Sequence, residues 1–313
     1  MDGIVKLKPA SASSEQQCAV AIVVANRNGL SHLKYSLPSI LATNWLNFTV
    51  IVSDNQSTDG SVEFVYAHYP NCIVVKTAAD NGFAGTVNAG LRYALGGEFA
   101  FIAIFNNDIM VKPDWIYVAI DALSKNPSGA VVGFTEVLKQ YGNIFQDWTD
   151  SPAERLGLTE VDEPPGCAFL CTTSSVRAVG LFDEGYYLYG EDNDFFCRLR
   201  KRGYVLYKSE LPIWHYGENT SRKVPFRASW LAYRNALRFS IKNQSPIRWV
   251  RMILALLNQG CNPMLSQDPT SPNSRRLRRY SIPVNFCFVA GSLFWNMWKL
   301  RTTFSARNGA TIK

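Results

Sequence analysis

The sequence predicts an α/β protein in which helices flank a mainly parallel central sheet. Short runs of continuously apolar residues alternate with stretches in which apolar residues recur at helical spacing. Strands that are apolar throughout are typical of a sheet buried on both faces, and strand–helix alternation is typical of parallel pairing. With 313 residues, 47% of them hydrophobic, the chain is long enough for one large domain or two smaller ones.

Five apolar runs in the first part of the chain are the expected strands, and four helices connect them. The strands are residues 19–25, 48–54, 72–77, 99–105 and 130–134. The helices are residues 31–43, 60–69, 83–96 and 114–125. Pro38 lies inside the first helix and predicts a kink or a break there.

Residues 135–166 have no clear period and end in Pro-Pro-Gly, so we expect a long irregular connection that serves as a lid or an acceptor-binding segment. A smaller αβ region should follow, with strands at 167–173 and 204–208 and a helix at 192–202. From about residue 221 the pattern becomes helical, over 230–241, 247–257 and 281–301.

Charge is divided unevenly along the chain. Residues 1–197 hold 11 Lys and Arg against 22 Asp and Glu, whereas residues 198–313 hold 21 against 3. The basic part indicates a polyanionic partner such as nucleic acid, anionic lipid or a phosphorylated substrate. No apolar run of 18 residues is present, which excludes a multi-spanning membrane protein. The seven cysteines show neither metal-site nor disulfide spacing, so we expect a cytoplasmic protein.

Polar clusters follow four of the expected strands, where an open parallel sheet binds its ligands. They begin at Asn26, Asp54, Asp80 and Asn106. A carboxylate such as Asp54 can accept hydrogen bonds from a base or ribose, and Gly82 and Gly85 allow a ligand close to the backbone. Each cluster taken alone is also what an ordinary turn prefers. The Gly-rich dinucleotide fingerprint and the P-loop are both absent.

Two further groups suggest metal binding and proton transfer. Asp108, at the end of the apolar run 99–105, suits a Mg²⁺ or Mn²⁺ ion, and His215 is a second candidate ligand. Three carboxylates crowd Glu191-Asp192-Asn193-Asp194, which can raise a carboxylate pKa and suit it to act as a general base. The alternative is helix capping, since acidic residues favour the first turn of a helix.

Six motifs in order resemble family 2 glycosyltransferases of the GT-A fold, especially bacterial rhamnosyltransferase-like enzymes. They are AIVVANRNG, VIVSDNQSTDGS, ADNGFAGTVNAG, FNND, GYYLYGEDNDFFCRLRKRGY and IWHYG. The resemblance covers about residues 19–240. It implies a catalytic domain (19–220) with a nucleotide-binding half (19–110) and an acceptor-binding half (111–220). The residues before it (1–18) are polar and rich in Ser and Lys, so a disordered lead-in is expected there. A basic helical region (221–313) completes the chain.

The resemblance also implies site residues. The nucleotide-sugar-binding set is Asn26, Asn28, Asp54, Asn55, Asn81, Gly82, Asn88, Asn106 and Asn107. Asn106-Asn107-Asp108 stands where the family has its Asp-X-Asp metal motif. Asn106 replaces the first carboxylate of that motif with an amide. Asp108 must then supply most of the metal binding, together with His215, and we expect Mg²⁺ or Mn²⁺ to be weakly held or dispensable. Asp192 corresponds to the catalytic base, and Glu191 helps to position it or the acceptor.

The implied reaction is an inverting transfer of a sugar, with rhamnose the first candidate, from a deoxythymidine- or uridine-diphosphate donor. A hydroxyl of a saccharide or lipid-linked acceptor receives it, in the synthesis of cell-surface polysaccharide. The same αβ topology with a metal carboxylate also fits a sugar-phosphate nucleotidyltransferase. A nucleic-acid-binding module is disfavoured, because the basic charge is confined to the C-terminal part.

The C-terminal region is interpreted from its residues alone. Residues 281–301 are mostly apolar, interrupted, and end in Trp, Lys and Arg. This composition suits a helix lying in the interface of an anionic membrane, with RRLRRY (275–280) facing the headgroups. The protein would then be peripheral on the inner face of the cytoplasmic membrane. A helix packed on the catalytic domain or in a homodimer interface is the alternative.

Overall fold

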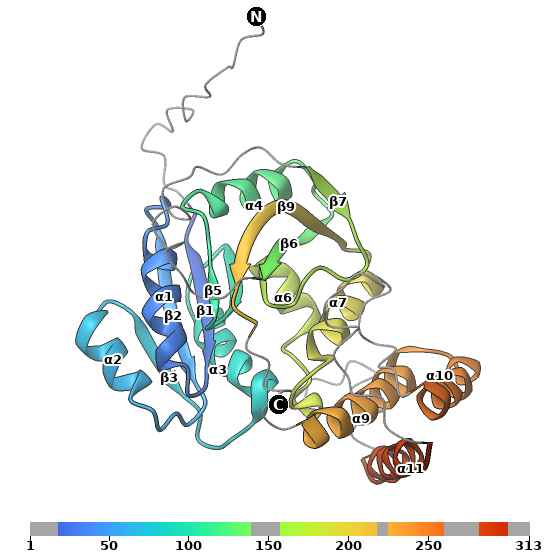
Figure 1. Ribbon diagram of the computed structural model, residues 1–313. Helices are drawn as coiled ribbons and strands as arrows, with labels where there is room; N and C mark the ends of the chain where they lie inside the picture. Colours follow the sequence, from blue (N-terminus) through green and yellow to red (C-terminus); the bar gives the residue numbers. More distant parts are fainter. Residues whose placement is uncertain (1–17, 139–156, 218–224, 260–281, 300–313) are drawn as a thin grey trace, which may run out of the picture.

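A single sheet of nine strands runs through the molecule, with helices on both of its faces (Figure 1). The computed structural model describes residues 18–138, 157–217, 225–259 and 282–299. Eight strands follow the order β3-β2-β1-β4-β8-β6-β9-β5, and β7 pairs with β9 outside this path. The expected lead-in falls almost wholly outside the described residues, as does the stretch RRLRRY.

The first half of the sheet is entirely parallel. β1 (Val20–Asn26) lies between β2 (Phe48–Asp54) and β4 (Phe101–Asn106), and β3 (Ile73–Lys76) extends the sheet beyond β2. The register pairs Asn26 with Asp54 and Ala25 with Asn106. The polar residues that follow these strands therefore meet at one edge, as predicted.

The second half of the sheet is mixed. β8 (Ala168–Thr172) runs antiparallel between β4 and β6 (Gly129–Leu138), and β9 (Val205–His215) is parallel to β6. Two short strands, β5 (Ile109–Met110) and β7 (Leu158–Glu160), pair antiparallel with β9. Because Ile109 pairs with His215, β5 brings that histidine beside Asp108.

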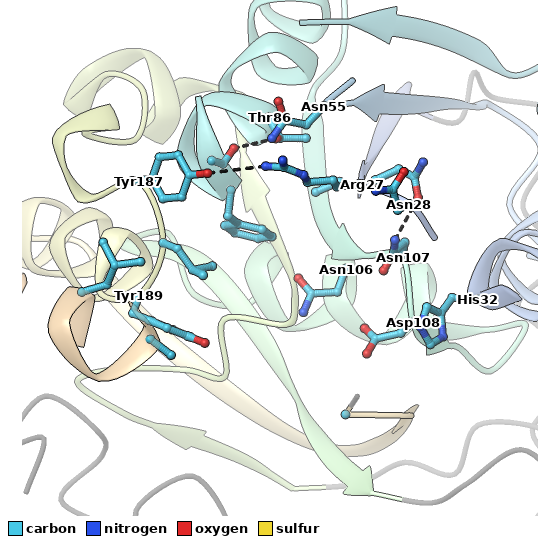
Figure 2. A pocket seen from close by; sticks show the side chains of 18 of the residues that line it. Arg27, Asn28, His32, Asn55, Thr86, Asn106, Asn107, Asp108, Tyr187 and Tyr189 are labelled. Carbon is cyan, nitrogen blue, oxygen red and sulfur yellow. Dashed lines mark hydrogen bonds between the residues drawn. The ribbon is translucent and has the colours of Figure 1, made fainter. Parts of the chain in front are cut away.

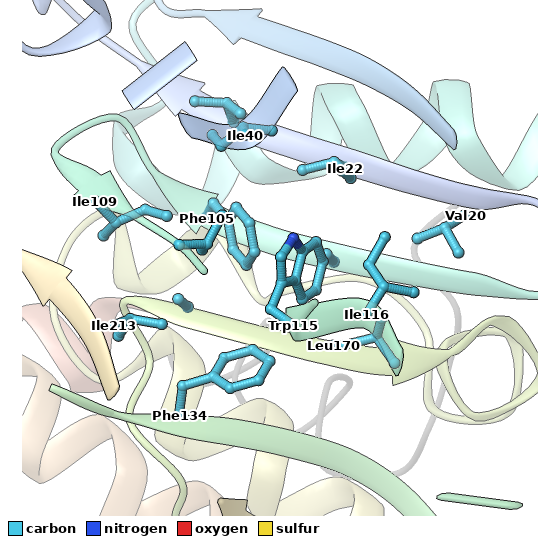
Figure 3. Packing of buried hydrophobic residues seen from close by; sticks show 14 of the residues in the cluster. Val20, Ile22, Ile40, Phe105, Ile109, Trp115, Ile116, Phe134, Leu170 and Ile213 are labelled. Atoms are coloured by element: carbon cyan, nitrogen blue, oxygen red, sulfur yellow. The ribbon is translucent and has the colours of Figure 1, made fainter. Parts of the chain in front are cut away.

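Two hydrophobic clusters fill the space between the sheet and its helices. One packs the sheet against α1 (Leu30–Leu41) and α4 (Trp115–Ser124), with α2 (Ser61–His68) at its margin. Trp115 lies at its centre, 4.9 Å from the ring of Phe105, and its indole donates to Thr43 (Figure 3). The other packs the opposite face against α3 (Gly82–Gly96), α6 (Thr173–Val179) and α7 (Glu191–Lys201). Strands buried on both faces explain the continuously apolar runs.

Several predicted boundaries need correction. α1 continues through Pro38 to Leu41 without a break, because this proline falls in the last turn, where it removes a single hydrogen bond. The stretch 135–166, expected to be irregular, contains strand in two places. β6 continues to Leu138, and β7 covers Leu158–Glu160. Residues 139–156 lie outside the described part. β9 is also longer than the strand predicted at 204–208.

The described parts of the C-terminal region, 225–259 and 282–299, are helical, as predicted. α9 (Pro225–Asn243) packs on α7 and on the short 3₁₀ helix η1 (Glu184–Tyr186), and α10 (Pro246–Gln259) and α11 (Ile282–Trp298) pack on α9 and on each other. Among the described residues, no helix is both long and apolar enough to cross a membrane. The expected basic surface is wrong for much of α9, because Arg234, Arg238 and Lys242 are buried. Arg238 and Lys242 pair with Asp183, and Lys242 also pairs with Asp194.

Candidate active site

A cavity of about 480 Å³ opens at the carboxyl edge of the parallel strands (Figure 2). Asn106, Asp108 and His32 line it from one side, and Tyr187 and Tyr189 from the other. Eight of the thirteen predicted site residues contribute to its lining: Asn26, Asn28, Asn55, Gly82, Asn106, Asn107, Asp108 and His215. In the described part of the lining, Asp108 is the sole acidic residue, whereas Arg27 and Arg227 are basic. This charge balance suits an anionic ligand.

Asn26 is the centre of a buried polar network that joins the turns after β1, β2 and β4. Its amide nitrogen lies 2.8 Å from Asp54 Oδ1 and 3.1 Å from the Ser61 hydroxyl, and its oxygen accepts from Asn107 at 2.8 Å. Asp54 lies behind the cavity wall and also accepts from the Ser57 backbone N–H at 3.0 Å. The turns after β1, β2 and β4 are therefore locked together before any ligand binds.

A second network crosses the cavity mouth through Asp80, which the sequence analysis did not select as a site residue. Its carboxylate accepts from Arg27 at 2.6 Å, from the Tyr187 hydroxyl at 2.9 Å and from Asn55 at 3.0 Å. Burial works against ionisation, but these donors together lower the pKa of Asp80. Asp80 thus connects the nucleotide half to the tyrosine segment on the opposite wall.

His215 links two carboxylates on the far side of the cavity. Its Nε2 is 3.1 Å from Asp108 Oδ1, and its Nδ1 is 2.6 Å from Glu136 Oε1. Burial alone would lower the pKa of His215, but its hydrogen bonds to the two carboxylates raise it to about 10. Glu136 was missed because it falls in the stretch predicted to be irregular, whereas β6 carries it to His215.

The pair Asp108 and His215 fits a divalent cation. A histidine that gives its second ring nitrogen to a carboxylate is a common metal-ligand arrangement, and Glu136 supplies that carboxylate. The 3.1 Å between the Asp108 and His215 ligand atoms matches two adjacent ligands of a six-coordinate ion, about 3 Å apart. Cys167, close to Glu136 and His215, is a poor ligand, since burial raises the pKa of its thiol well above its usual range.

The segment Tyr186–Gly190 forms the opposite wall in a strained conformation. Tyr187, Tyr189 and Gly190 all have positive φ, at 64°, 72° and 87°, which is rare for tyrosine. Gly82 also has positive φ, and a β-carbon there would lie 2.2 Å from the Tyr187 carbonyl oxygen. The wall thus depends on close backbone contact with the start of α3.

Helix α9 holds this strained segment from behind. The Asn235 amide donates to the carbonyl oxygens of Tyr186, Leu188 and Tyr189 at 2.7–2.9 Å. Arg234 donates to the carbonyls of Gly185 and Tyr186. Both side chains are almost fully buried. Donors from a distant helix thus help the segment to keep its strained conformation.

Buried ion pairs fix α9 to the catalytic domain. Asp183 accepts from Arg238 and Lys242, each at 2.9 Å, and Asp194 accepts from Lys242 at 2.8 Å and from Arg198 at 2.9 Å. Burial alone would raise the pKa of Asp183, but the charges of Lys242 and Arg238 lower it to about 2. Asp194 is therefore structural through its ion pairs, whereas α7 has no side-chain cap at its N-terminus.

Glu191 and Asp192 form the first turn of α7, directly after the tyrosine wall, and neither lines the cavity. Burial raises the pKa of both carboxyls, and the charge of Asp192 raises that of Glu191 further. Glu191 Oε2 is buried without a hydrogen-bond partner, whereas Asp192 Oδ1 accepts from the Asn193 backbone N–H at 2.8 Å. Of the two, Glu191 therefore keeps its proton to higher pH.

The remaining predicted residues lie around the cavity rather than in its lining. Asn81 is exposed at the start of α3. Asn88 is buried, and its amide exchanges hydrogen bonds of 2.9 Å with the Phe182 backbone N–H and carbonyl. It joins α3 to the segment that leads into the tyrosine wall. His32, which the sequence analysis did not select, also lines the cavity, because it falls in the first turn of α1.

The fold is that of a GT-A protein. The mannosyltransferase PcManGT of Pyrobaculum calidifontis, solved with GDP-Man and Mn²⁺, matches with a TM-score of 0.56 at 14% identity, covering 96% of this chain and 87% of its own. S. aureus TarS matches with a TM-score of 0.55 at 15% identity, covering 93% of this chain and 53% of its own. At these identities the likeness supports the fold alone.

Sequence comparison gives the family. The model for glycosyl transferase family 2 matches residues 20–178. An N-acetylglucosaminyl-diphospho-decaprenol L-rhamnosyltransferase of Mycobacterium tuberculosis is 27% identical over 286 residues, covering 79% of this chain and 92% of the relative. The chain belongs to glycosyl transferase family 2. It is a glycosyltransferase that uses a nucleotide sugar, and the nucleotidyltransferase and nucleic-acid-binding alternatives are set aside.

Proposed function

We propose that this enzyme transfers a sugar, with rhamnose the first candidate, from a deoxythymidine- or uridine-diphosphate donor to a lipid-linked or saccharide hydroxyl. The cavity is the observation that carries this proposal, because it lies between the predicted nucleotide-binding turns and the segment leading to Asp192. Its two arginines suit a diphosphate. The rhamnosyltransferase relative, which spans most of the chain, supports the sugar and the lipid-linked acceptor.

The proposed chemistry is a single displacement with inversion. Asp192 takes the proton from the acceptor hydroxyl, whose oxygen attacks the anomeric carbon from the side opposite the diphosphate. The bond from the anomeric carbon to the diphosphate oxygen breaks, and the nucleoside diphosphate leaves with the bonding electrons. The raised pKa of Asp192 brings its basicity closer to neutral pH. Glu191, which keeps its proton longer, leaves the negative charge on Asp192.

Asp108 and His215 would hold Mg²⁺ or Mn²⁺, and Glu136 would orient the histidine. When bound, the ion would offset negative charge on the departing diphosphate. Arg27 stays oriented by Asp80, and Tyr187 and Tyr189 form the wall facing Asn106 and Asp108. We assign Asn26, Asn28, Asn55, Gly82, Asn106 and Asn107 to the donor side of the cavity.

A panel of nucleotide sugars tests the proposal. Thermal shift with each donor should select a deoxythymidine- or uridine-diphosphate sugar, since a ligand at 100 times its Kd stabilises the fold by about 2.7 kcal/mol. Incubation of the selected donor with a prenyl-diphosphate-linked sugar should then give a glycoside of inverted anomeric configuration by NMR. Retained configuration, or selection of a nucleoside triphosphate with a sugar phosphate, would contradict the proposal.

A further inference from the structure

The outward face of α11 is apolar along its whole length. Phe286, Phe294, Met297 and Trp298 are 61–76% exposed, although all are large and hydrophobic. With Ala290, also exposed, they recur every three or four residues and so share one side of the helix. The helix contains no charged residue between 282 and 298. A face of this kind is unusual on a helix that meets water.

The opposite face of α11 carries polar groups toward the protein. Asn285, Ser292 and Asn296 are at most 2% exposed. Asn285 accepts from the Tyr233 hydroxyl at 2.8 Å, and the Asn296 amide donates to the Arg234 carbonyl of α9 at 3.0 Å. The inward side therefore mixes these polar groups with buried Phe288 and Val289, whereas the exposed side carries apolar residues only. An exposed apolar side of this length indicates an apolar medium around it.

Helix α10 continues the apolar surface and adds positive charge. Ile247, Val250 and Leu254 are 58–69% exposed and lie on one side of the helix. Arg248 and Arg251 are exposed beside them. α10 packs against α11, and both lie at the same end of the molecule, beyond α9 (Figure 1). We call this combined face of α10 and α11 the helical face.

We propose that the helical face docks on an anionic lipid bilayer and lies in its interface. Exposed aromatic and aliphatic side chains flanked by arginines match a surface with an apolar interior and anionic headgroups. A second copy of the chain is a poorer occupant. In a symmetric dimer the same patch faces itself, so Arg248 and Arg251 would approach their own charges.

The inward side of α11 contacts the start of α9, which leads to the cavity. The Phe226 ring, 64% exposed at the start of α9, packs 4.9 Å from the Phe288 ring of α11. The next residue, Arg227, lines the cavity with its guanidinium 5.2 Å from the Tyr187 ring centre. A docked enzyme would therefore place its cavity near the headgroups. An acceptor could keep its lipid chain in the bilayer during transfer, a consequence that rests on the proposed function.

Vesicle sedimentation with the full chain tests docking. The protein should bind vesicles of equal phosphatidylglycerol and phosphatidylcholine more strongly than pure phosphatidylcholine. The double variant Phe294→Asp/Met297→Asp should lose at least tenfold in bound fraction, because both charges would enter the apolar layer. Arg248→Glu/Arg251→Glu should abolish the preference for anionic vesicles. The matched control is Leu46→Asp, at a residue 89% exposed on the catalytic domain, and it should bind as the parent does.

Any of three results would overturn docking. The parent protein fails to sediment with anionic vesicles, or the apolar-face variant Phe294→Asp/Met297→Asp binds as well as Leu46→Asp does. The third is a parent protein that is a dimer in light scattering and that the apolar-face variant converts to a monomer. Transfer to a water-soluble acceptor separates this proposal from the proposed function. If docking fails but the function holds, both the parent and the apolar-face variant still turn over that acceptor. If only the function fails, neither turns it over while vesicle binding persists.

Discussion

The two walls of the cavity are built in different ways. The nucleotide side consists of turns that follow adjacent parallel strands, and its central residue, Asn26, bonds to groups on the neighbouring turns. The opposite side is a strained tyrosine segment whose carbonyls are held by Asn235, some 46 to 49 residues further along the chain. Sheet geometry therefore places the first wall, whereas tertiary contacts with α9 place the second. The C-terminal region is part of the site rather than an appendage.

The largest effect is expected from breaking the ion pairs that hold α9, and with it the tyrosine wall, in place. Asp183→Asn leaves Arg238 and Lys242 without one of their buried acidic partners, so the free energy of unfolding should fall by about 3–5 kcal/mol near pH 7. Because the native state depresses the pKa of Asp183 to about 2, this stabilisation is present above its unfolded value of about 4. It is lost as pH falls from about 4 toward 2.

Urea denaturation of both proteins between pH 2 and 7 measures this effect. The gap between the parent and Asp183→Asn should be constant above pH 5 and narrow below pH 4. Asp121→Asn is a control, since Asp121 forms an exposed ion pair with Lys125 that contributes little. A gap that does not change with pH would show that Asp183 does not hold α9 through its charge.

A smaller effect is expected at the proposed metal site. Glu136→Gln removes the carboxylate that orients His215, so the affinity for Mn²⁺ should fall about 10- to 100-fold. Calorimetric titration with Mn²⁺ alone measures this change. Glu160→Gln, on the neighbouring exposed strand β7, should bind the ion as the parent does. Equal affinity in Glu136→Gln would remove Glu136 from the site.

The smallest effects are expected from one substitution in each wall, which should change different kinetic and binding constants. Asn235→Ala removes the donors to the tyrosine segment, so it should lower kcat and cost about 1–3 kcal/mol of stability while leaving nucleotide affinity unchanged. Asn26→Ala should instead weaken nucleotide binding, because it unlocks the turns after β1 and β2. Calorimetry with the nucleoside diphosphate and steady-state kinetics separate the two. Loss of nucleotide affinity in Asn235→Ala would contradict the division into two walls.

The nucleotide wall is the part that the sequence predicts well. Local composition is enough to predict the continuously apolar strands and the polar turns that follow them along the chain. Parallel pairing then brings those turns to one edge of the sheet. Six predicted residues of this wall therefore meet in the cavity lining: Asn26, Asn28, Asn55, Gly82, Asn106 and Asn107. The strands around Asn26 and Asp54 also begin or end within a few residues of their predicted bounds.

The second wall and its supports could not be predicted in the same way. The positive φ of Tyr187 and Tyr189 depends on donors from α9, which no local pattern shows. The buried charges of α9 look like a basic surface in the sequence, because their partners Asp183 and Asp194 lie far along the chain. Glu136 was hidden in a stretch without clear periodicity, since its strand pairs with the distant β9.

The central claim is that Asp192, which follows the wall that α9 supports, is the base of an inverting transfer. Asp192→Asn tests it most directly, with transfer and nucleotide affinity measured on the same preparation. Because an amide cannot accept the acceptor proton, transfer should fall about 10³-fold or more, while the nucleoside diphosphate binds as it does to the parent. A variant that retains substantial transfer would contradict the account.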